Sequence, residues 1–455
     1  MSNWINKAII YHIYTLGFCG APEQNNDEVI CTNKIKKVLD WIEHLKTLGI
    51  NTILFGPLFE STSHGYDTAD YCKLDKRLGT NEDFKEVCKV LHEEGFRIIL
   101  DGVFNHVGRD FFAFKDLQQH RENSKYKDWF CNVNFWGSSP YGDSFSYEGW
   151  EGHYNLVKLN VWNQEVRDYL FKAVELWIKE FDIDGLRLDV AYCIDEGFLS
   201  TLRRFVDTKK EDFWLMGEMI HGDYSRLTKP GLLHSTTDYE CYKGIYSSHN
   251  DKNYFEINHS MNRLFGKGGL CENLKLYNFV DNHDVERIGS ILKEKRHLEN
   301  VYTLLFTMPG IPSIYYGSEW GIEGKKVQGT DKSLRPELEI DKMLAEDQTV
   351  VEHISKLSAI YKQYPALQEG SYEQVIVRNQ QLIFARSLGD ETVYTVLNLQ
   401  GEAMQLEFSE KRGESLINAL DEEEGIIRCE NGLIRVQVPP FSSKILVSSK
   451  KYLGK

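Results

Sequence analysis

The segment Gly185-Leu-Arg-Leu-Asp-Val-Ala191 contains two charged residues within an apolar run. Successive side chains of a strand point to opposite faces, so Arg187 and Asp189 share one face and the leucines share the other. A buried charge is costly unless it is paired or functional. The segment therefore predicts a buried strand whose polar face carries chemistry.

Similar apolar runs recur along the first three quarters of the chain, and helical patterns separate several of them. Ile35, Val38, Leu39 and Ile42 repeat at helical spacing, and a second such pattern follows Thr80, a plausible cap. Each apolar helix stripe needs a sheet face, so eight strands with crossover helices favour a (β/α)8 TIM barrel in the α/β class. The expected strands lie near residues 8–14, 52–56, 97–103, 185–190, 213–219, 236–242, 276–284 and 312–319.

Two parts of the chain depart from this alternation. The interval after the third strand is too long for a simple connection, which predicts a small inserted domain B over residues 106–159. After about residue 370 the pattern changes to alternating strands, so residues 366–455 should form a C-terminal antiparallel β-sandwich domain. The barrel itself is then expected over residues 1–105 and 160–365.

Bulk composition limits the classes of partner. The chain has 53 basic and 68 acidic residues, a net charge of −15, which disfavours nucleic acid because binding it requires basic residues. No apolar stretch approaches the ~20 residues of a membrane span, and the N-terminus does not resemble a signal peptide. Nine cysteines without a CxxC pair favour reduced thiols. We expect a cytoplasmic protein without a membrane partner, and the oligomeric state is left open.

Polar clusters follow four of the expected strands. They are Asp101-Gly-Val-Phe-Asn105-His106, the Arg187 to Asp189 segment, Gly217-Glu218-Met219 and Asn282-His283-Asp284. In a barrel, reactive residues lie at the C-terminal ends of the strands. A lone aspartate there is more often a helix cap, but four clusters together are hard to explain as structure. Arg187 can hold Asp189 ionised, and the apolar setting of Glu218 should raise its pKa, so the pair fits the two carboxylates of glycoside hydrolysis.

These four segments resemble the ordered sequence regions of the α-amylase family of glycoside hydrolases, over residues 1 to about 360. The resemblance implies that Asp189 is the nucleophile, Glu218 the general acid/base and Asp284 a third essential carboxylate that holds sugar hydroxyls. It also implies that the −1 sugar or the nucleophile contacts Tyr66, His106, Arg187 and His283. Tyr66 would be the aromatic platform for that sugar.

Finer resemblance points toward neopullulanases and cyclomaltodextrinases. Leu156-Val-Lys-Leu-Asn160 is similar to their Met-Pro-Lys-Leu-Asn signature, but Val157 replaces its proline and Ile220 replaces a tryptophan that usually follows the acid/base. We expect no N-terminal β domain before the barrel. Cyclodextrin preference and dimerisation therefore do not follow from the resemblance.

Several assignments have alternatives. Asp67 and Arg335 could form a salt bridge that closes the pocket, as in related exo-acting glucosidases, although Asp67 could equally cap a loop. Asn105 matches a calcium ligand of true α-amylases, but Tyr192-Cys193 replaces the Lys-His pair of that site, so we expect no required cofactor and doubt a calcium site. No metal ligand is assigned, because His106 and His283 lack ligand spacing. The aromatics of the insertion could stack on glucose or form its own core: Phe135, Trp136, Tyr141, Tyr147 and Trp150.

The sequence thus predicts a retaining hydrolase of the α-amylase, neopullulanase and maltodextrinase type that cleaves α-glucosidic bonds of maltodextrins. An α-glucanotransferase on the same scaffold is the alternative, and a non-catalytic carbohydrate-binding or transporter-partner subunit is a remote one. The preference for α-1,4 or α-1,6 bonds and the choice between endo and exo action are not predicted.

Overall fold

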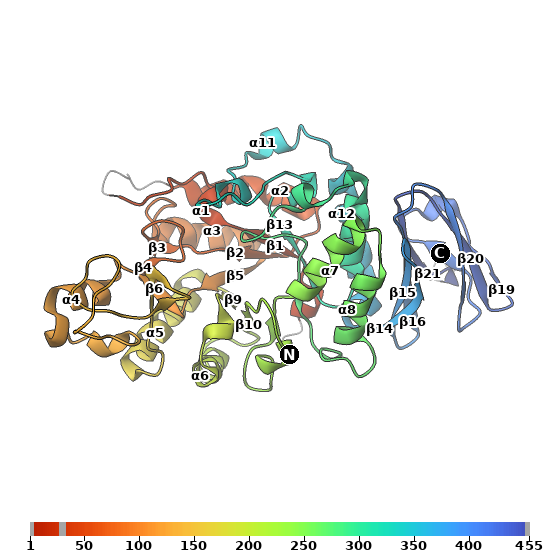
Figure 1. The fold of residues 1–455 in the computed structure, drawn as a ribbon. Helices are drawn as coiled ribbons and strands as arrows, with labels where there is room; N and C mark the ends of the chain where they lie inside the picture. The colour runs from red at the N-terminus through yellow and green to blue at the C-terminus, as the bar shows by residue number, and fades with distance from the viewer. Residues whose placement is uncertain (1–3, 27–32, 451–455) are drawn as a thin grey trace.

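The computed structural model describes residues 4–26 and 33–450, and eight parallel strands form its central sheet. A parallel bridge between Thr237 and Tyr277 joins the two outer strands of that sheet and closes it into the predicted barrel (Figure 1). In spatial order the strands are β11 (Ser235–Thr236), β10 (Trp214–Gly217), β9 (Gly185–Leu188), β5 (Arg97–Gly102), β2 (Thr52–Phe55), β1 (Ile10–Ile13), β13 (Ile311–Tyr315) and β12 (Tyr277–Asn278).

Helices cover the outside of the barrel. In α3, Thr80 and Asp83 form a capping box, which confirms the predicted start. Residues 34–41 form a 3-10 helix that leads into α2, so the first predicted helix is split. The helices before the insertion are α1 (Thr15–Phe18), α2 (Ile42–Thr47) and α3 (Asn81–Glu93), and α4 (Phe112–His120) lies within it. Those after it are α5 (Gln164–Phe181), α6 (Glu196–Asp207), α7 (Tyr239–Asn250), α8 (Phe255–Phe265), α9 (Ile288–Ile291), α10 (Leu298–Thr307), α11 (Ile340–Met343), α12 (Thr349–Gln363) and α13 (Pro365–Glu369).

One strand prediction was wrong in part. We expected a strand over residues 236–242, but the strand ends at Thr236 and α7 begins at Tyr239. Asp238 is the physical reason, because its carboxylate accepts a hydrogen bond from the Cys241 amide and caps the helix.

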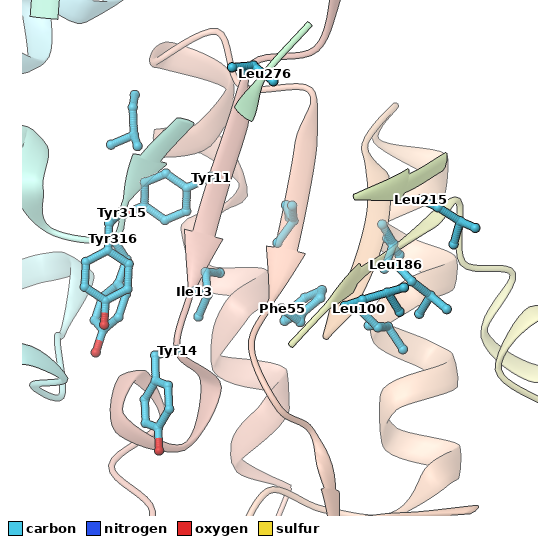
Figure 2. Packing of buried hydrophobic residues seen from close by; sticks show 14 of the residues in the cluster. Tyr11, Ile13, Tyr14, Phe55, Leu100, Leu186, Leu215, Leu276, Tyr315 and Tyr316 are labelled. Atoms are coloured by element: carbon cyan, nitrogen blue, oxygen red, sulfur yellow. The ribbon is translucent and has the colours of Figure 1, made fainter. Parts of the chain in front are cut away.

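Alternation along the strands separates two apolar layers. Leu100, Leu186 and Leu215, from three neighbouring strands, belong to the large core beneath the helices (Figure 2). Ile10, Ile99 and Met216 belong to a separate cluster with the opposite parity. That cluster fills the barrel interior, and the polar residues two positions further along each strand lie on top of it.

Residues between the third and fourth barrel strands carry a small sheet of their own. The sheet consists of β6 (His106–Gly108), β8 (His153–Lys158) and β7 (Gly149–Trp150), with α4 beside it. Before it, β3 (Phe59–Ser61) and β4 (Thr68–Leu74) form a hairpin that ends close to β6. From these elements we propose residues 106–159 as the limits of the inserted domain.

The C-terminal part forms two antiparallel sheets at the opposite end of the barrel from α4 (Figure 1). The first contains β14 (Ser371–Val377), β15 (Gln381–Leu388), β16 (Glu391–Asn398), β21 (Ser443–Ser448) and β18 (Leu416–Asn418). The second contains β17 (Met404–Ser409), β20 (Leu433–Val438) and β19 (Cys429–Glu430). We propose that this domain begins at residue 366.

Candidate active site

Arg187 lies at the centre of the polar end of the barrel. Its guanidinium contacts both carboxylate oxygens of Asp101 at 2.8 Å and Glu218 Oε1 at 2.9 Å. Asp189 Oδ1 lies 3.5 Å from the same group. Three strands, β5, β9 and β10, therefore direct three carboxylates at one cation, as expected for inward-facing residues of the same parity.

Three carboxylates surround one guanidinium, and this imbalance of charge affects the pKa of Asp189. Burial raises the pKa of Asp189 well above its ordinary value, the charge of Glu218 adds to the rise, and Arg187 opposes it. The sequence led us to expect that Arg187 keeps Asp189 ionised. In the structure, burial and the charge of Glu218 raise the pKa of Asp189 by more than Arg187 lowers it.

Asp284 has the most exposed of the three carboxylate side chains proposed from the sequence. It is 38% exposed, against 10% for Asp189 and 4% for Glu218. His283 Nε2 lies 3.0 Å from one of its oxygens and Arg335 Nη2 lies 3.1 Å from the other. Burial acts to raise the pKa of Asp284, but the charge and hydrogen bond of His283 and the charge of Arg335 hold it well below its ordinary value. Asp284 is therefore ionised at neutral pH.

Arg335 and Asp67 do not form the expected salt bridge in the structure. Arg335 instead pairs with Asp284 and Asp331, and its guanidinium lies 4.4 Å from the centre of the Tyr14 ring. Asp67 accepts a hydrogen bond from Ser63 at 2.8 Å. Tyr14 connects Arg335 with the loop that carries Asp67. Its ring lies under the Arg335 guanidinium, and its hydroxyl donates a hydrogen bond to the carbonyl of His64, three residues before Asp67.

Tyr66 and Tyr14 both stack against the imidazole of His283. The ring centres lie 5.5 Å and 5.9 Å from it, with the planes inclined by 12° and 17°. The Tyr66 hydroxyl donates to Asp101 at 2.9 Å and also contacts His283 Nε2. The Tyr66 ring, which we predicted to be the platform for the sugar, is thus held in place by the hydrogen bonds of its hydroxyl and by the stacking of one ring face on His283.

His106 lies near the carboxylate oxygen of Asp189 that does not contact Arg187. Its Nε2 is 3.8 Å from Asp189 Oδ2, and burial lowers the pKa of His106 to about 3, so the ring is neutral at physiological pH. Trp150 from the insertion packs against it, with ring centres 5.8 Å apart. Of the aromatics left open by the sequence, Tyr147 is buried in the insertion's core, whereas Trp136 is 97% exposed. Only Trp150 among these five contacts a residue proposed for the site.

The side chain of Asn105 contacts the histidine that follows it. The Asn105 side-chain amide contacts His106 Nδ1 at 3.1 Å, which makes it a support for that ring. Over residues 4–26 and 33–450, no group of three or more His, Cys, Asp or Glu side chains is placed to hold a metal ion. Calcium prefers several oxygen ligands, and the chain offers Tyr192 and Cys193 where the family pattern has Lys-His.

Several buried polar atoms around the carboxylates have no hydrogen-bond partner among the described residues. They are Asp67 Oδ1, His106 Nε2, His283 Nδ1 and His12 Nε2. Such atoms are rare in protein interiors because an unpaired buried polar group is costly. These four atoms are therefore free to form hydrogen bonds with water or with a ligand.

Glu218 is held by one residue that follows β9 and by one at the start of α7. Its Oε2 accepts a hydrogen bond from the Val190 amide at 2.9 Å, and the Tyr239 hydroxyl lies 3.4 Å from Oε1. Val190 has a φ of 40°, which is a left-handed conformation that β-branched residues rarely adopt. The unusual backbone immediately after Asp189 thus directs an N–H group at Glu218.

Sequence reasoning missed several residues of this site. Asp101 was quoted but given no role, and its inward parity with Arg187 could have identified it. His12 and Tyr14 alternate with apolar residues at the end of the first strand, which is the same signal. Nothing in the sequence indicated a role in the site for Tyr239, because we assigned it to a strand.

The fold and the site together define a barrel glycoside hydrolase, in which paired carboxylates lie at the C-terminal strand ends. Residues 23–356 match the family model of the α-amylase catalytic domain, and residues 372–445 match that of the maltogenic amylase C-terminal domain. The chain belongs to the α-amylase family. No helix among the described residues is long and apolar enough to cross a membrane.

Two curated relatives and one solved structure illustrate the similarity. A cyclomaltodextrinase of Geobacillus thermopakistaniensis (strain MAS1) is 29% identical over 468 residues, which cover 96% of this chain and 76% of the relative. An intracellular maltogenic amylase of Bacillus subtilis is 31% identical over 378 residues, covering 82% and 62%. A solved cyclomaltodextrinase structure, 26% identical, superposes with a TM-score of 0.86 over 98% of this chain and 79% of that one.

Proposed function

We propose that this protein is a retaining hydrolase of α-glucans that acts on maltodextrins, with Asp189 as nucleophile and Glu218 as general acid/base. One observation carries the proposal: Arg187 contacts both carboxylates, at 3.5 Å and 2.9 Å, so they face one reaction centre. Retaining glycosidases hold such a pair ~5–5.5 Å apart. The curated relatives named cyclomaltodextrinase and maltogenic amylase support α-glucans as the substrate class.

In the first step, an oxygen of ionised Asp189 attacks the anomeric carbon while Glu218 donates its proton to the leaving oxygen. The glycosidic C–O bond breaks, an ester bond to Asp189 forms, and the shortened glucan leaves with a new hydroxyl. The raised pKa of Asp189 reflects a cluster that retains one proton, which is what this step requires. Before the attack this single proton has to lie on Glu218, which leaves Asp189 as the carboxylate that attacks.

In the second step, Glu218 takes a proton from water, which attacks the same carbon and releases Asp189 as a carboxylate. Asp284 is ionised and partly exposed, so it can accept hydrogen bonds from two sugar hydroxyls. Neutral His106 can donate to or accept from a third hydroxyl, and Tyr66 offers a ring face. Asp67 and Arg335 complete the proposed set of substrate-binding residues.

Product analysis tests the proposal. Maltooligosaccharides, pullulan and cyclodextrin should be converted to shorter chains, and the α-anomer should form first, because two displacements retain configuration. First release of the β-anomer, or no release of reducing ends from any of the three, would refute it. The same time course separates hydrolysis from the alternative of glucan transfer, in which chains longer than the substrate dominate early.

Hydrolysis by two carboxylates needs no cofactor, and we propose that this enzyme requires none. Activity that disappears on dialysis against EDTA and returns with calcium would contradict this. We also propose a cytoplasmic location, which the intracellular maltogenic amylase relative supports. Fractionation of the native host's cells would check it.

A further inference from the structure

A concave surface is formed by α7 together with the segment that follows Asp284. It has a volume of ≈ 380 Å³ and is lined by Tyr242, Tyr246, Glu286, Ser290, Ile291 and Lys325. We call it the tyrosine groove. Its volume lies within the ~300–1,000 Å³ of typical small-molecule pockets.

Two elements lead from the candidate site to the groove, α7 and the segment that follows Asp284. Tyr239, Tyr242 and Tyr246 follow one face of α7 at i, i+3 and i+7, and the adjacent rings are 6.0 Å and 5.1 Å apart. Tyr239 contacts Glu218 Oε1 and also accepts a hydrogen bond from Asn282. On the opposite wall, Glu286 follows Asp284 by two residues. The row of rings covers about 10 Å along the helix.

The groove walls are fixed, but part of their polar surface is unused. The Lys326 amide donates to Glu286 Oε1 at 3.2 Å, and the Gly324 amide donates to Ser290 at 2.9 Å. Tyr242 packs one ring face on Phe279, with centres 5.1 Å apart. Among the described residues, neither the Tyr242 hydroxyl nor the Tyr246 hydroxyl is hydrogen-bonded to the protein.

The chemistry of these walls fits a neutral sugar. One carboxylate and one lysine give no net charge, so the groove does not favour an ion. Aromatic faces beside hydroxyl, carboxylate and ammonium groups match a ligand that has apolar ring faces and many hydroxyl groups. A glucan chain that is bound at Asp284, the most exposed of the three carboxylates, would have to extend into this groove.

We propose that the tyrosine groove is an additional subsite that binds a glucosyl unit of the same α-glucan chain, several units from the bond that is cleaved. This proposal rests on the function proposed above. It explains why a row of tyrosines leads away from Glu218 on a helix whose other face is buried. A groove subsite should favour long substrates over short ones, because only long chains reach it.

The test compares a long and a short ligand in the full chain carrying Asp189→Asn, which should bind but not cleave. Adding Tyr246→Ser should raise the Kd of maltoheptaose about tenfold, equivalent to ~1.4 kcal/mol, and leave the Kd of maltotriose unchanged. Lys325→Ser, at an exposed position, should give a smaller rise for maltoheptaose alone. Phe255→Ser is the matched control, since it removes a 47% exposed ring from α8 outside the groove.

Calorimetric titration distinguishes the outcomes. An unchanged Kd for maltoheptaose in both groove variants would overturn the proposal. A similar loss for maltotriose would overturn it too, because that result indicates a disturbed active site. Failure of the wild-type chain to cleave either glucan would refute the proposed function itself, which is a separate outcome.

Discussion

At the residue scale, the arrangement of charge around Arg187 dominates the chemistry. One buried guanidinium contacts Asp101, Asp189 and Glu218, and a cation cannot neutralise three buried anions. A proton therefore remains in the cluster above the pH at which an exposed aspartate would release it. The cost of ionising Asp189 is thus built into the folded state.

This cost predicts that Asp189→Asn stabilises the protein while abolishing turnover. A carboxyl whose pKa is raised on folding contributes stability below its unfolded pKa, and that contribution is lost as the pH rises through the folded value. At neutral pH the variant should therefore melt at a higher temperature than the wild type. The gain should shrink toward zero near pH 4, the ordinary pKa of aspartate.

Thermal melts between pH 4 and pH 8 measure this difference. Asp341→Asn, at an exposed position on α11, serves as the control and should show no pH-dependent gain. A variant that is less stable than the wild type at pH 7 would show that Asp189 is held ionised after all.

Val190 provides a second test at this scale. Its left-handed backbone is costly for any residue with a Cβ, by ~1–2 kcal/mol. Val190→Gly should therefore be more stable than Val190→Ala by about 1 kcal/mol. At Val206, buried within helix α6, the order should reverse. Urea unfolding of the four variants compares them, and an Ala variant at 190 at least as stable as the Gly variant would contradict the account.

At the element scale, the strand ends matter more than the strand centres. The alternation of side chains along a strand predicted that Arg187 and Asp189 face the barrel interior. In the structure, the polar residues lie two positions after the apolar residues that fill the interior. Contacts across the barrel, such as Tyr14 with His283, could not be predicted, because they depend on how distant loops meet. Residues 239–242 were assigned to a strand because short apolar runs are ambiguous, and the cap at Asp238 was the signal overlooked.

The contact between β6 of the insertion and the loop of the β3–β4 hairpin should determine the position of Tyr66 and Asp67 in the site. A Cβ on Gly108, in β6, would lie 2.3 Å from the carbonyl oxygen of Asp67. Gly108→Ala must therefore displace the loop that carries Tyr66 and Asp67. We expect kcat/KM to fall about 100-fold, as for a ~1 Å misplacement of reacting groups.

Steady-state kinetics with maltoheptaose check this effect. Gly401→Ala is the matched control, because only atoms of the Phe441 ring lie near its Cβ, the nearest at 3.1 Å. Wild-type kcat/KM in the Gly108 variant would show that the loop position does not matter.

At the scale of the whole molecule, the C-terminal domain shares a core with the barrel. Leu382 and Phe384 in β15 belong to the same buried cluster as the barrel helices, whereas Ile383 belongs to a second cluster between the two C-terminal sheets. Arg386 reinforces the junction by donating to the carbonyls of Thr307 and Gly370. Alternation made the antiparallel domain predictable, but its attachment was not, because both faces of β15 are apolar.

This shared core predicts that the two parts unfold together. Phe384→Ala should cost ~3–5 kcal/mol and lower the temperature of a single calorimetric transition, with activity lost over the same range. Trp136→Ala, which truncates a 97% exposed ring, should leave that temperature almost unchanged. Two separate transitions, with the one that accompanies activity loss unmoved by Phe384→Ala, would contradict a joint core.

The central claim is that Asp189 forms the covalent bond to the sugar and Glu218 does not. A 5-fluoro-α-glucosyl fluoride allows the first step but slows the second, so the sugar should accumulate on the nucleophile. Digestion and tandem mass spectrometry should then locate one added sugar on Asp189 within residues 185–191. A label on Glu218 or Asp284, or no covalent label while the reagent is still hydrolysed, would contradict the account.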